Sequence, residues 1–227
     1  MENPCYQYLM QQLLLTLMAV LATTSFGFSE IKMEGAKATL EKWNQRFTDG
    51  NALAHNWQKG MVAKTGNLGQ TPSVAVLTCA DSRTPPEVIF DFGVGDLFVC
   101  RNAGGFDTPE VNATFEYGVA ALGVHTILVL GHSKCGAVTA TLEGKPVPGN
   151  ISILTKALQP GIDKIHQEHS DLSKEDQLNH AVEALVRYQM IEVIKNSELL
   201  QKAKADGKLQ IMGAVYDVET GKVRFLN

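Results

Sequence analysis

Short apolar runs recur along this chain with room for a helix between each pair. Three runs rich in Val, Leu and Ile cover residues 73–78, 97–100 and 126–131. A strand that is apolar at every position is buried on both faces, as strands of parallel sheets are. Helical patterns over 85–90 and 110–122 separate the runs. This alternation predicts parallel βαβ units with right-handed crossovers, and so an α/β fold.

The flanking segments complete the predicted architecture. Apolar residues at helical spacing predict helices over 34–48 and 175–195, and the polar, Gly/Pro-punctuated stretch 146–173 contains some helix. Two apolar segments, 209–216 and 222–226, indicate a core strand and a hairpin-paired edge strand. A chain of 227 residues suits one domain with a substantial core. We therefore expect a single α/β domain: a mostly parallel four-stranded sheet with an antiparallel C-terminal edge strand, flanked by helices.

The first residues have the pattern of an export signal. A compact apolar run over 13–22 precedes small and polar residues, with Ser25 and Gly27 at suitable −3 and −1 positions. The run is shorter than the ~20 apolar residues of a membrane span. A signal peptide usually begins with a basic segment, and no Lys or Arg precedes this run. We predict a signal peptide over 1–27, a folded domain over 28–227, a periplasmic or secreted location, and no stable membrane association after cleavage. An uncleaved membrane anchor and a buried N-terminal helix are the alternatives.

Charge and cysteine content narrow the possible functions. The net charge is −4 and no Lys/Arg cluster forms a phosphate-binding stripe, which argues against nucleic acid as a partner. Of four cysteines, Cys5 would leave with the signal peptide, and Cys79, Cys100 and Cys135 would remain. Three cysteines are an odd number and too few for a disulfide framework. We therefore expect the remaining cysteines to serve a role other than disulfide bonding.

Two groups of polar residues begin where buried strands are predicted to end. Cys79, Asp81 and Arg83 follow the first strand, and His132 and Cys135 follow the third. Ligands in open α/β sheets bind at the carboxyl ends of strands, so these groups can meet. Two thiolates and an imidazole suit zinc, and three protein ligands leave an open catalytic position. The alternatives are buried core thiols with a core histidine, and a structural ion pair between Asp81 and Arg83.

These motifs, Cys-x-Asp-x-Arg and then His-x-x-Cys-Gly, resemble the β-class carbonic anhydrases from about Gln70 to Cys135, and the flanking helices and C-terminal strands fit that family's α/β fold. The resemblance implies a catalytic domain over 28–227 that hydrates carbon dioxide reversibly to bicarbonate and a proton. It implies one Zn²⁺ per subunit on three ligands: Cys79, His132 and Cys135. Asp81 and Arg83 would form a dyad that orients a zinc-bound hydroxide, because an adjacent guanidinium keeps a carboxylate ionised.

The same resemblance implies substrate-binding positions and an assembly. Gln70 corresponds to a glutamine that hydrogen-bonds substrate across a dimer interface. Phe98, Ala103 and Tyr117 correspond to the substrate pocket, although simple core packing also explains Phe98 and Tyr117. The implied assembly is a homodimer or a dimer of dimers, with Gln70 and Tyr117 reaching towards the partner subunit's zinc.

One departure from the family pattern is informative. Members with a non-catalytic bicarbonate pocket have Trp where this chain has Val76 and Gly where it has Thr78, and they share Arg101. We therefore expect a constitutively open site with water as the fourth ligand. Two rival functions remain: hydrolysis of carbonyl sulfide or carbon disulfide, and zinc binding without turnover. The retention of Asp81 and Arg83 argues against the second.

Overall fold

The computed structural model describes residues 31–53, 59–163 and 165–227. The predicted signal peptide, 1–27, lies outside these residues. Within the described ranges, no helix combines the length and apolar character needed to cross a membrane.

Five strands form one sheet in the order β2-β1-β3-β4-β5. The strands are β1 Val74–Cys79, β2 Leu97–Asn102, β3 Thr126–His132, β4 Gln210–Tyr216 and β5 Val223–Phe225. The first four strands are parallel, and β5 pairs antiparallel with β4. All six residues of β1 are buried, as the continuous apolar run predicts. The predicted sheet is therefore confirmed, including its antiparallel edge strand.

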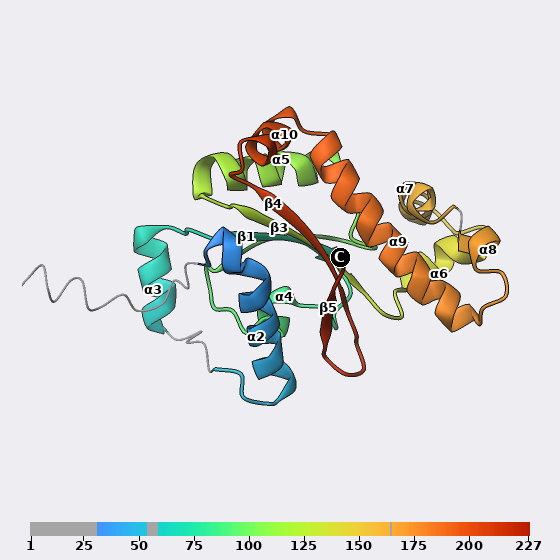
Figure 1. Cartoon of the computed structure of the whole chain (residues 1–227), viewed down its shortest axis with the longest axis horizontal. Coiled ribbons are helices and arrows are strands. Elements are labelled where there is room, and N and C mark those ends of the chain that lie inside the picture. The colour runs from blue at the N-terminus through green and yellow to red at the C-terminus, as the bar shows by residue number, and fades with distance from the viewer. Residues whose placement is uncertain (1–30, 54–58, 164) are drawn as a thin grey trace, which may run out of the picture.

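Helices occupy the segments between strands and cover the sheet (Figure 1). They are η1 Met33–Gly35, α2 Ala36–Thr48, α3 Lys59–Leu68, α4 Pro86–Ile89, α5 Pro109–Tyr117, η2 Gly118–Leu122, α6 Gly136–Glu143, α7 Ile151–Ile162, α8 Ile165–Glu168, α9 Lys174–Lys195 and α10 Glu198–Ala205. Side-chain caps fix several starts, since Thr108, Ser173 and Ser197 each accept a hydrogen bond from a backbone N–H three residues later. Three helices, α3, α6 and α10, have no counterpart among the predicted segments.

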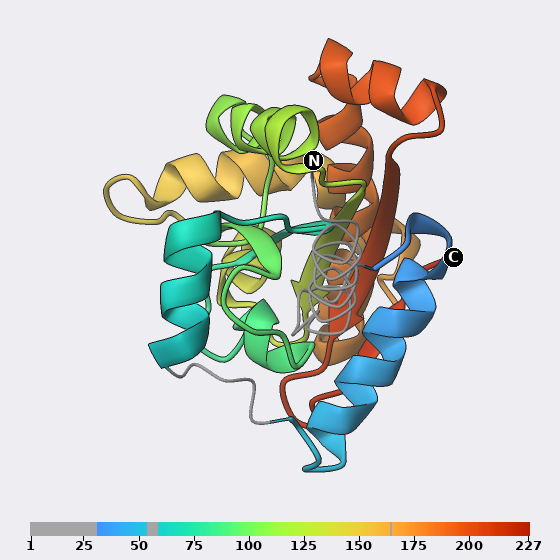
Figure 2. The same ribbon diagram turned by 90° about the vertical axis from the view of Figure 1, so that its left-hand side faces the viewer.

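Alternate strand residues face two separate cores. Val76 and Leu128 pack with α2 and the segment around α4, whereas Leu77 and Ile127 pack with α5, α9 and α10. Figure 1 shows α2 and α5 on opposite sides of the strands, and the quarter-turn in Figure 2 keeps them apart. The sheet is therefore the middle layer of three.

A third cluster lies where the parallel strands end. It joins Cys79 and Cys135 to apolar residues of α6, α7 and α9, among them Val138, Leu158 and Leu185. The helices that follow β3 thus enclose this edge of the sheet from one side. The predicted metal ligands lie at this enclosed edge.

Candidate metal site

The three predicted metal ligands converge at the carboxyl edge of the sheet. Cys79 is the last residue of β1, His132 is the last residue of β3, and Cys135 caps the start of α6. Their ligand atoms all lie within 4.8 Å of one another, and all three residues are buried. A cavity of about 10 Å³ borders the three residues. Segments far apart in the sequence thus form one compact set of donors.

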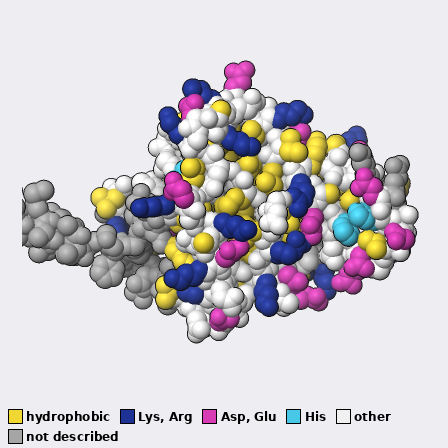
Figure 3. All heavy atoms as spheres, in the orientation of Figure 1, with side chains coloured by type: hydrophobic (Ala, Val, Ile, Leu, Met, Phe, Trp, Pro, Cys, Tyr) yellow, Lys and Arg dark blue, Asp and Glu magenta, His cyan; other side chains and the backbone are white. Residues whose placement is uncertain are grey.

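His132 is oriented to offer one ring nitrogen to this set. Its Nδ1 lies 2.8 Å from the backbone carbonyl oxygen of Ser133. A carbonyl can only accept, so Nδ1 carries the proton and Nε2 keeps a free lone pair. Nε2 is buried and has no hydrogen-bond partner among the described residues. By contrast, the histidine side chains visible in Figure 3 lie on the surface, close to Asp and Glu side chains. A metal ion would satisfy this buried lone pair.

The two cysteine sulfurs lie close enough to affect each other's protonation. The contact with Cys135 lowers the pKa of Cys79, against the opposing effect of burial. The same contact, together with burial, raises the pKa of Cys135. Of the two sulfurs, Cys79 therefore loses its proton the more readily. A bound dication would favour loss of the second proton, and two sulfurs with one imidazole nitrogen suit Zn²⁺.

Glycines allow the loop after β2 to lie against the first ligand. Gly105 has φ of +66°, and a Cβ there would lie 3.1 Å from the backbone carbon of Thr78. Only glycine combines this conformation with so close an approach. The approach brings the N–H of Gly104 within 3.3 Å of Cys79 Sγ, to which it donates. Ala103, the predicted pocket residue, immediately precedes this pair and is half-buried.

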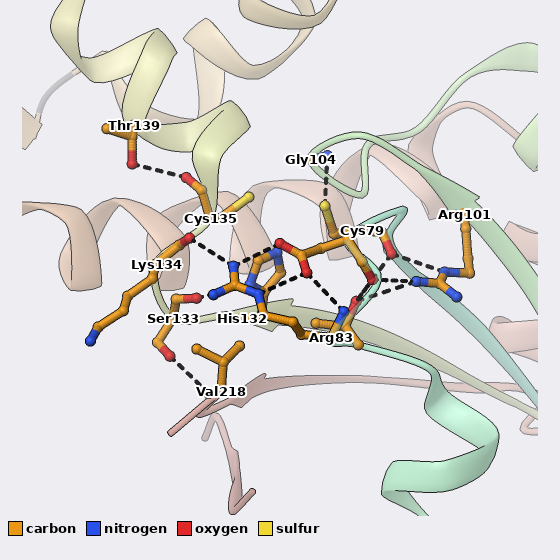
Figure 4. A network of polar contacts seen from close by, with 12 residues as sticks. Cys79, Arg83, Arg101, Gly104, His132, Ser133, Lys134, Cys135, Thr139 and Val218 are labelled. Atoms are coloured by element: carbon orange, nitrogen blue, oxygen red, sulfur yellow. Dashed lines mark hydrogen bonds and ion pairs between the residues drawn. The ribbon is translucent and has the colours of Figure 1, made fainter. Parts of the chain in front are cut away.

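Arg83, which Figure 4 shows beside Cys79 and His132, forms a two-pronged ion pair with Asp81. Arg83 Nε donates to Asp81 Oδ1 at 2.9 Å and Nη2 donates to Oδ2 at 2.7 Å. Chiefly through the guanidinium hydrogen bonds, the pKa of Asp81 lies well below its usual range, and that of Arg83 is raised. Asp81 is therefore a carboxylate at neutral pH. Oδ1 also accepts from the backbone N–H of Arg83 at 2.9 Å, so Oδ2 is the oxygen that retains a lone pair for a further hydrogen bond.

Arg101 and Thr84 hold the backbone of this first loop, a role that the sequence did not reveal. Arg101 reaches from β2 and donates to the carbonyl oxygens of Cys79 at 3.0 Å and Asp81 at 2.6 Å. The buried hydroxyl of Thr84 lies 3.2 Å and 2.9 Å from the same two oxygens. Side chains that act on backbone carbonyls leave no motif, because every residue offers that acceptor.

The remaining predicted pocket residues are not brought to the metal site within one chain. Gln70 is exposed, and Tyr117 is 56% exposed. The rings of Phe98 and Tyr117 pair with their centroids 6.2 Å apart. None of the three is among the residues that line the cavity beside the metal ligands.

Comparison with known proteins gives a consistent result. A family model described as "Carbonic anhydrase" matches residues 74–223, which include every predicted ligand and the dyad. The chain is 34% identical over 190 residues to a carbonic anhydrase of Mycolicibacterium smegmatis. That match covers 81% of this chain and 88% of its relative.

Solved structures share the same fold. A Coccomyxa β-carbonic anhydrase in complex with acetazolamide superposes with a TM-score of 0.68 at 29% identity, covering 87% of each chain. One of two tetrameric β-carbonic anhydrases from Sordaria macrospora superposes with a TM-score of 0.69 at 24% identity, covering 86% of this chain and 96% of the other. At that identity the second likeness concerns the fold alone.

Proposed function

This chain belongs to the β-class carbonic anhydrases, and from that membership we propose that it works through one zinc ion on Cys79, His132 and Cys135. A carbonic anhydrase is a carbonate dehydratase, a lyase that interconverts carbon dioxide with bicarbonate and a proton. The observation that carries the zinc proposal is the buried, unpartnered Nε2 of His132, grouped with two cysteine sulfurs. A zinc ion with three protein ligands would supply hydroxide at neutral pH, because it lowers the pKa of water to about 7.

We propose that Asp81 orients the attacking oxygen and that Arg83 orients Asp81. As an ionised acceptor, the carboxylate takes a hydrogen bond from the attacking oxygen and so directs a lone pair at the carbon of carbon dioxide. Arg83 holds both carboxylate oxygens and keeps them from the open coordination position. The fixed pair thus avoids reorganisation during the reaction, the source of much of the catalysis in preorganised sites.

We further propose that the site is constitutively open, with water as the fourth ligand. Two contacts support this. Thr78 is buried and its hydroxyl donates to the carbonyl oxygen of Leu130 at 2.9 Å, and Arg101 is engaged by the carbonyl oxygens of Cys79 and Asp81. The Thr78 hydroxyl is thus bonded within the sheet, and Arg101 already uses its Nε and Nη2 donors to hold the loop after β1.

Zinc dependence is tested by metal analysis together with stopped-flow hydration of carbon dioxide. We expect about one zinc per chain, loss of activity with a chelator, and recovery on adding zinc. Cys135→Ala should lose both metal and activity, because three ligands become two. The matched control is Cys100→Ala. It removes a buried thiol of β2 that packs in the core with α5, α9 and α10, and burial raises the pKa of this thiol. Undiminished hydration by metal-free protein would refute the zinc proposal.

We propose a homodimer, alone or paired into a tetramer, in which Gln70 and Tyr117 face the partner's site. The exposure of Gln70 and of the Tyr117 ring supports this. Light scattering during size-exclusion chromatography tests it, and a monomer with full activity would contradict it.

We also propose export, with cleavage after Gly27, on the strength of the apolar run over 13–22. N-terminal sequencing of the protein from the periplasm or medium of a bacterial host should begin at Phe28. Recovery of the full chain from the cytoplasm alone would contradict export.

A further inference from the structure

The loop that carries His132 and Cys135 turns at Lys134, whose backbone φ is +55°. This left-handed conformation is strained for any residue with a Cβ. Among the described residues, Asp91 is the only other non-glycine residue with a positive φ. Strain of this kind persists where surrounding contacts hold it in place. The contacts of Lys134 therefore bear on how the ligand loop keeps its shape.

Three contacts join this loop to the β4–β5 hairpin. Figure 4 shows the one between Ser133 and Val218. The N–H of Ser133 donates to the carbonyl oxygen of Tyr216 at 2.9 Å, and its hydroxyl accepts from the N–H of Val218 at 3.0 Å. The ammonium of Lys134 donates to Glu219 Oε1 at 2.5 Å. Both residues between the two ligands are thus held by the C-terminal hairpin.

The hairpin is itself well anchored. Asp217 Oδ1 accepts from the backbone N–H groups of Glu219 and Thr220 at 2.8 and 2.9 Å, which fixes the turn. Asn44 of α2 donates to the carbonyl oxygen of Gly221 at 2.9 Å. The turn that carries Glu219 is therefore anchored to α2.

The backbone of Lys134 continues these contacts to the dyad. Its carbonyl oxygen accepts from Arg83 Nη2 at 3.4 Å, and the same nitrogen donates to Asp81 Oδ2 at 2.7 Å. A continuous series of polar contacts thus runs from Glu219 through Lys134 and Arg83 to Asp81. A shift of the Lys134 carbonyl would change the position of the guanidinium that holds the carboxylate.

We propose that Lys134 is a positioning residue, and that its ion pair with Glu219 sets the ligand loop so that Arg83 and Asp81 keep their orientation. The catalytic part of this inference rests on the proposed function. The two side chains are 45% and 64% exposed, so the pair adds little to global stability. Its effect is local, on the shape of one loop.

Glu219→Gln tests the proposal, because it keeps the shape of the side chain and removes its charge. We expect kcat to fall by about three- to tenfold, with KM within about twofold and the melting temperature within about 2 °C of wild type. The matched control is Asp206→Asn, which breaks the exposed Lys202–Asp206 pair of α10 (3.0 Å) and should leave kcat unchanged. The exchange Lys134→Glu with Glu219→Lys should recover most of the kcat that either single change loses.

Hydrogen exchange of metal-stripped protein supplies a readout that does not depend on turnover. Peptides that cover 131–136 should exchange faster in Glu219→Gln than in the Asp206→Asn control. Equal exchange and equal kcat in the two variants would overturn the proposal while leaving zinc-dependent hydration intact. Absence of zinc-dependent hydration in the wild type would refute the proposed function, and the exchange rates would still decide whether Glu219 holds the loop.

Discussion

Within the described part of the chain, two arginine–aspartate pairs differ mainly in burial. Arg46 of α2 bonds Asp91, just after α4, at 2.6 Å, and their side chains are 23% and 2% exposed. Arg83 bonds Asp81 at 2.7 Å, with side chains 48% and 19% exposed. Asp91 also accepts from the backbone N–H of Leu53 and lies within the structural core of α2 and α4. Asp81 lies at the carboxyl edge of the sheet beside the metal ligands.

This difference separates two uses of the same chemical pair. Breaking a buried pair leaves an uncompensated charge and costs about 3–5 kcal/mol of stability, whereas an exposed pair contributes about 0–1 kcal/mol. Removal of either partner of the buried Arg46–Asp91 pair should therefore destabilise the fold. The two-pronged geometry of the exposed pair fixes the direction of a carboxylate instead. Matched substitutions of the two aspartates should consequently have opposite effects.

Asp81→Asn should have the largest effect, and it should be confined to catalysis. An amide has one oxygen acceptor and no charge, so it cannot orient the attacking oxygen while bound by Arg83. We expect hydration to fall by about 100- to 1000-fold, with zinc content unchanged and unfolding free energy within about 1 kcal/mol of wild type. Stopped-flow assays, metal analysis and denaturant unfolding measure the three quantities. Full activity would refute the proposed role of the dyad.

Asp91→Asn should have the reverse effect. Asparagine tolerates the left-handed backbone at this position, where φ is +52°, so loss of the charge is the main change. We expect a loss of about 2 kcal/mol in unfolding free energy, below the value for a fully buried pair because Arg46 retains some contact with water. The kcat of the folded protein should stay near wild type. A drop in kcat as large as that of Asp81→Asn would abolish the contrast between the pairs.

The smallest expected effect concerns the pH at which the Asp81 carboxylate takes up a proton. Since its pKa is lowered mainly by the Arg83 hydrogen bonds, the carboxyl should remain ionised from pH 7 down to about pH 4. Its contribution to stability is complete above about pH 3.9, the ordinary aspartate pKa, and is lost only as the pH falls through the lowered value. Arg83→Gln should move this titration up towards pH 3.9. Carbon-13 NMR of labelled aspartate measures both, and wild-type protonation near pH 4 would contradict the expectation.

The sheet was predictable from the sequence because a strand that is buried on both faces has a continuous run of apolar residues. All five strands lie within two residues of their predicted limits. Helices were harder: α6 is short and rich in β-branched Val and Thr, and α7 contains Pro160, which usually ends a helix. The start of α10 did carry a signal, the Ser197 cap followed by helix formers, and it was missed.

The convergence of Cys79, His132 and Cys135, and the ion pair between Asp81 and Arg83, were predictable for a different reason. Each half is a local motif at the end of a strand, and parallel strands bring their ends together. The contacts of Arg101 with two carbonyl oxygens, and of Lys134 with Glu219, join residues on different elements. No local pattern encodes such pairings, so they required the three-dimensional structure.

The position of the ligands also governs when a metal can be acquired. Cys79 ends β1 and His132 ends β3, so the site exists only after these strands have paired. In an unfolded chain, His132 and Cys135 alone offer a metal ion an incomplete set of donors. Uptake of the proposed metal would therefore follow formation of the sheet centre. If export in an unfolded state and zinc binding both hold as proposed, the chain would take its zinc from the compartment where it folds, and active enzyme could form only where that compartment supplies zinc.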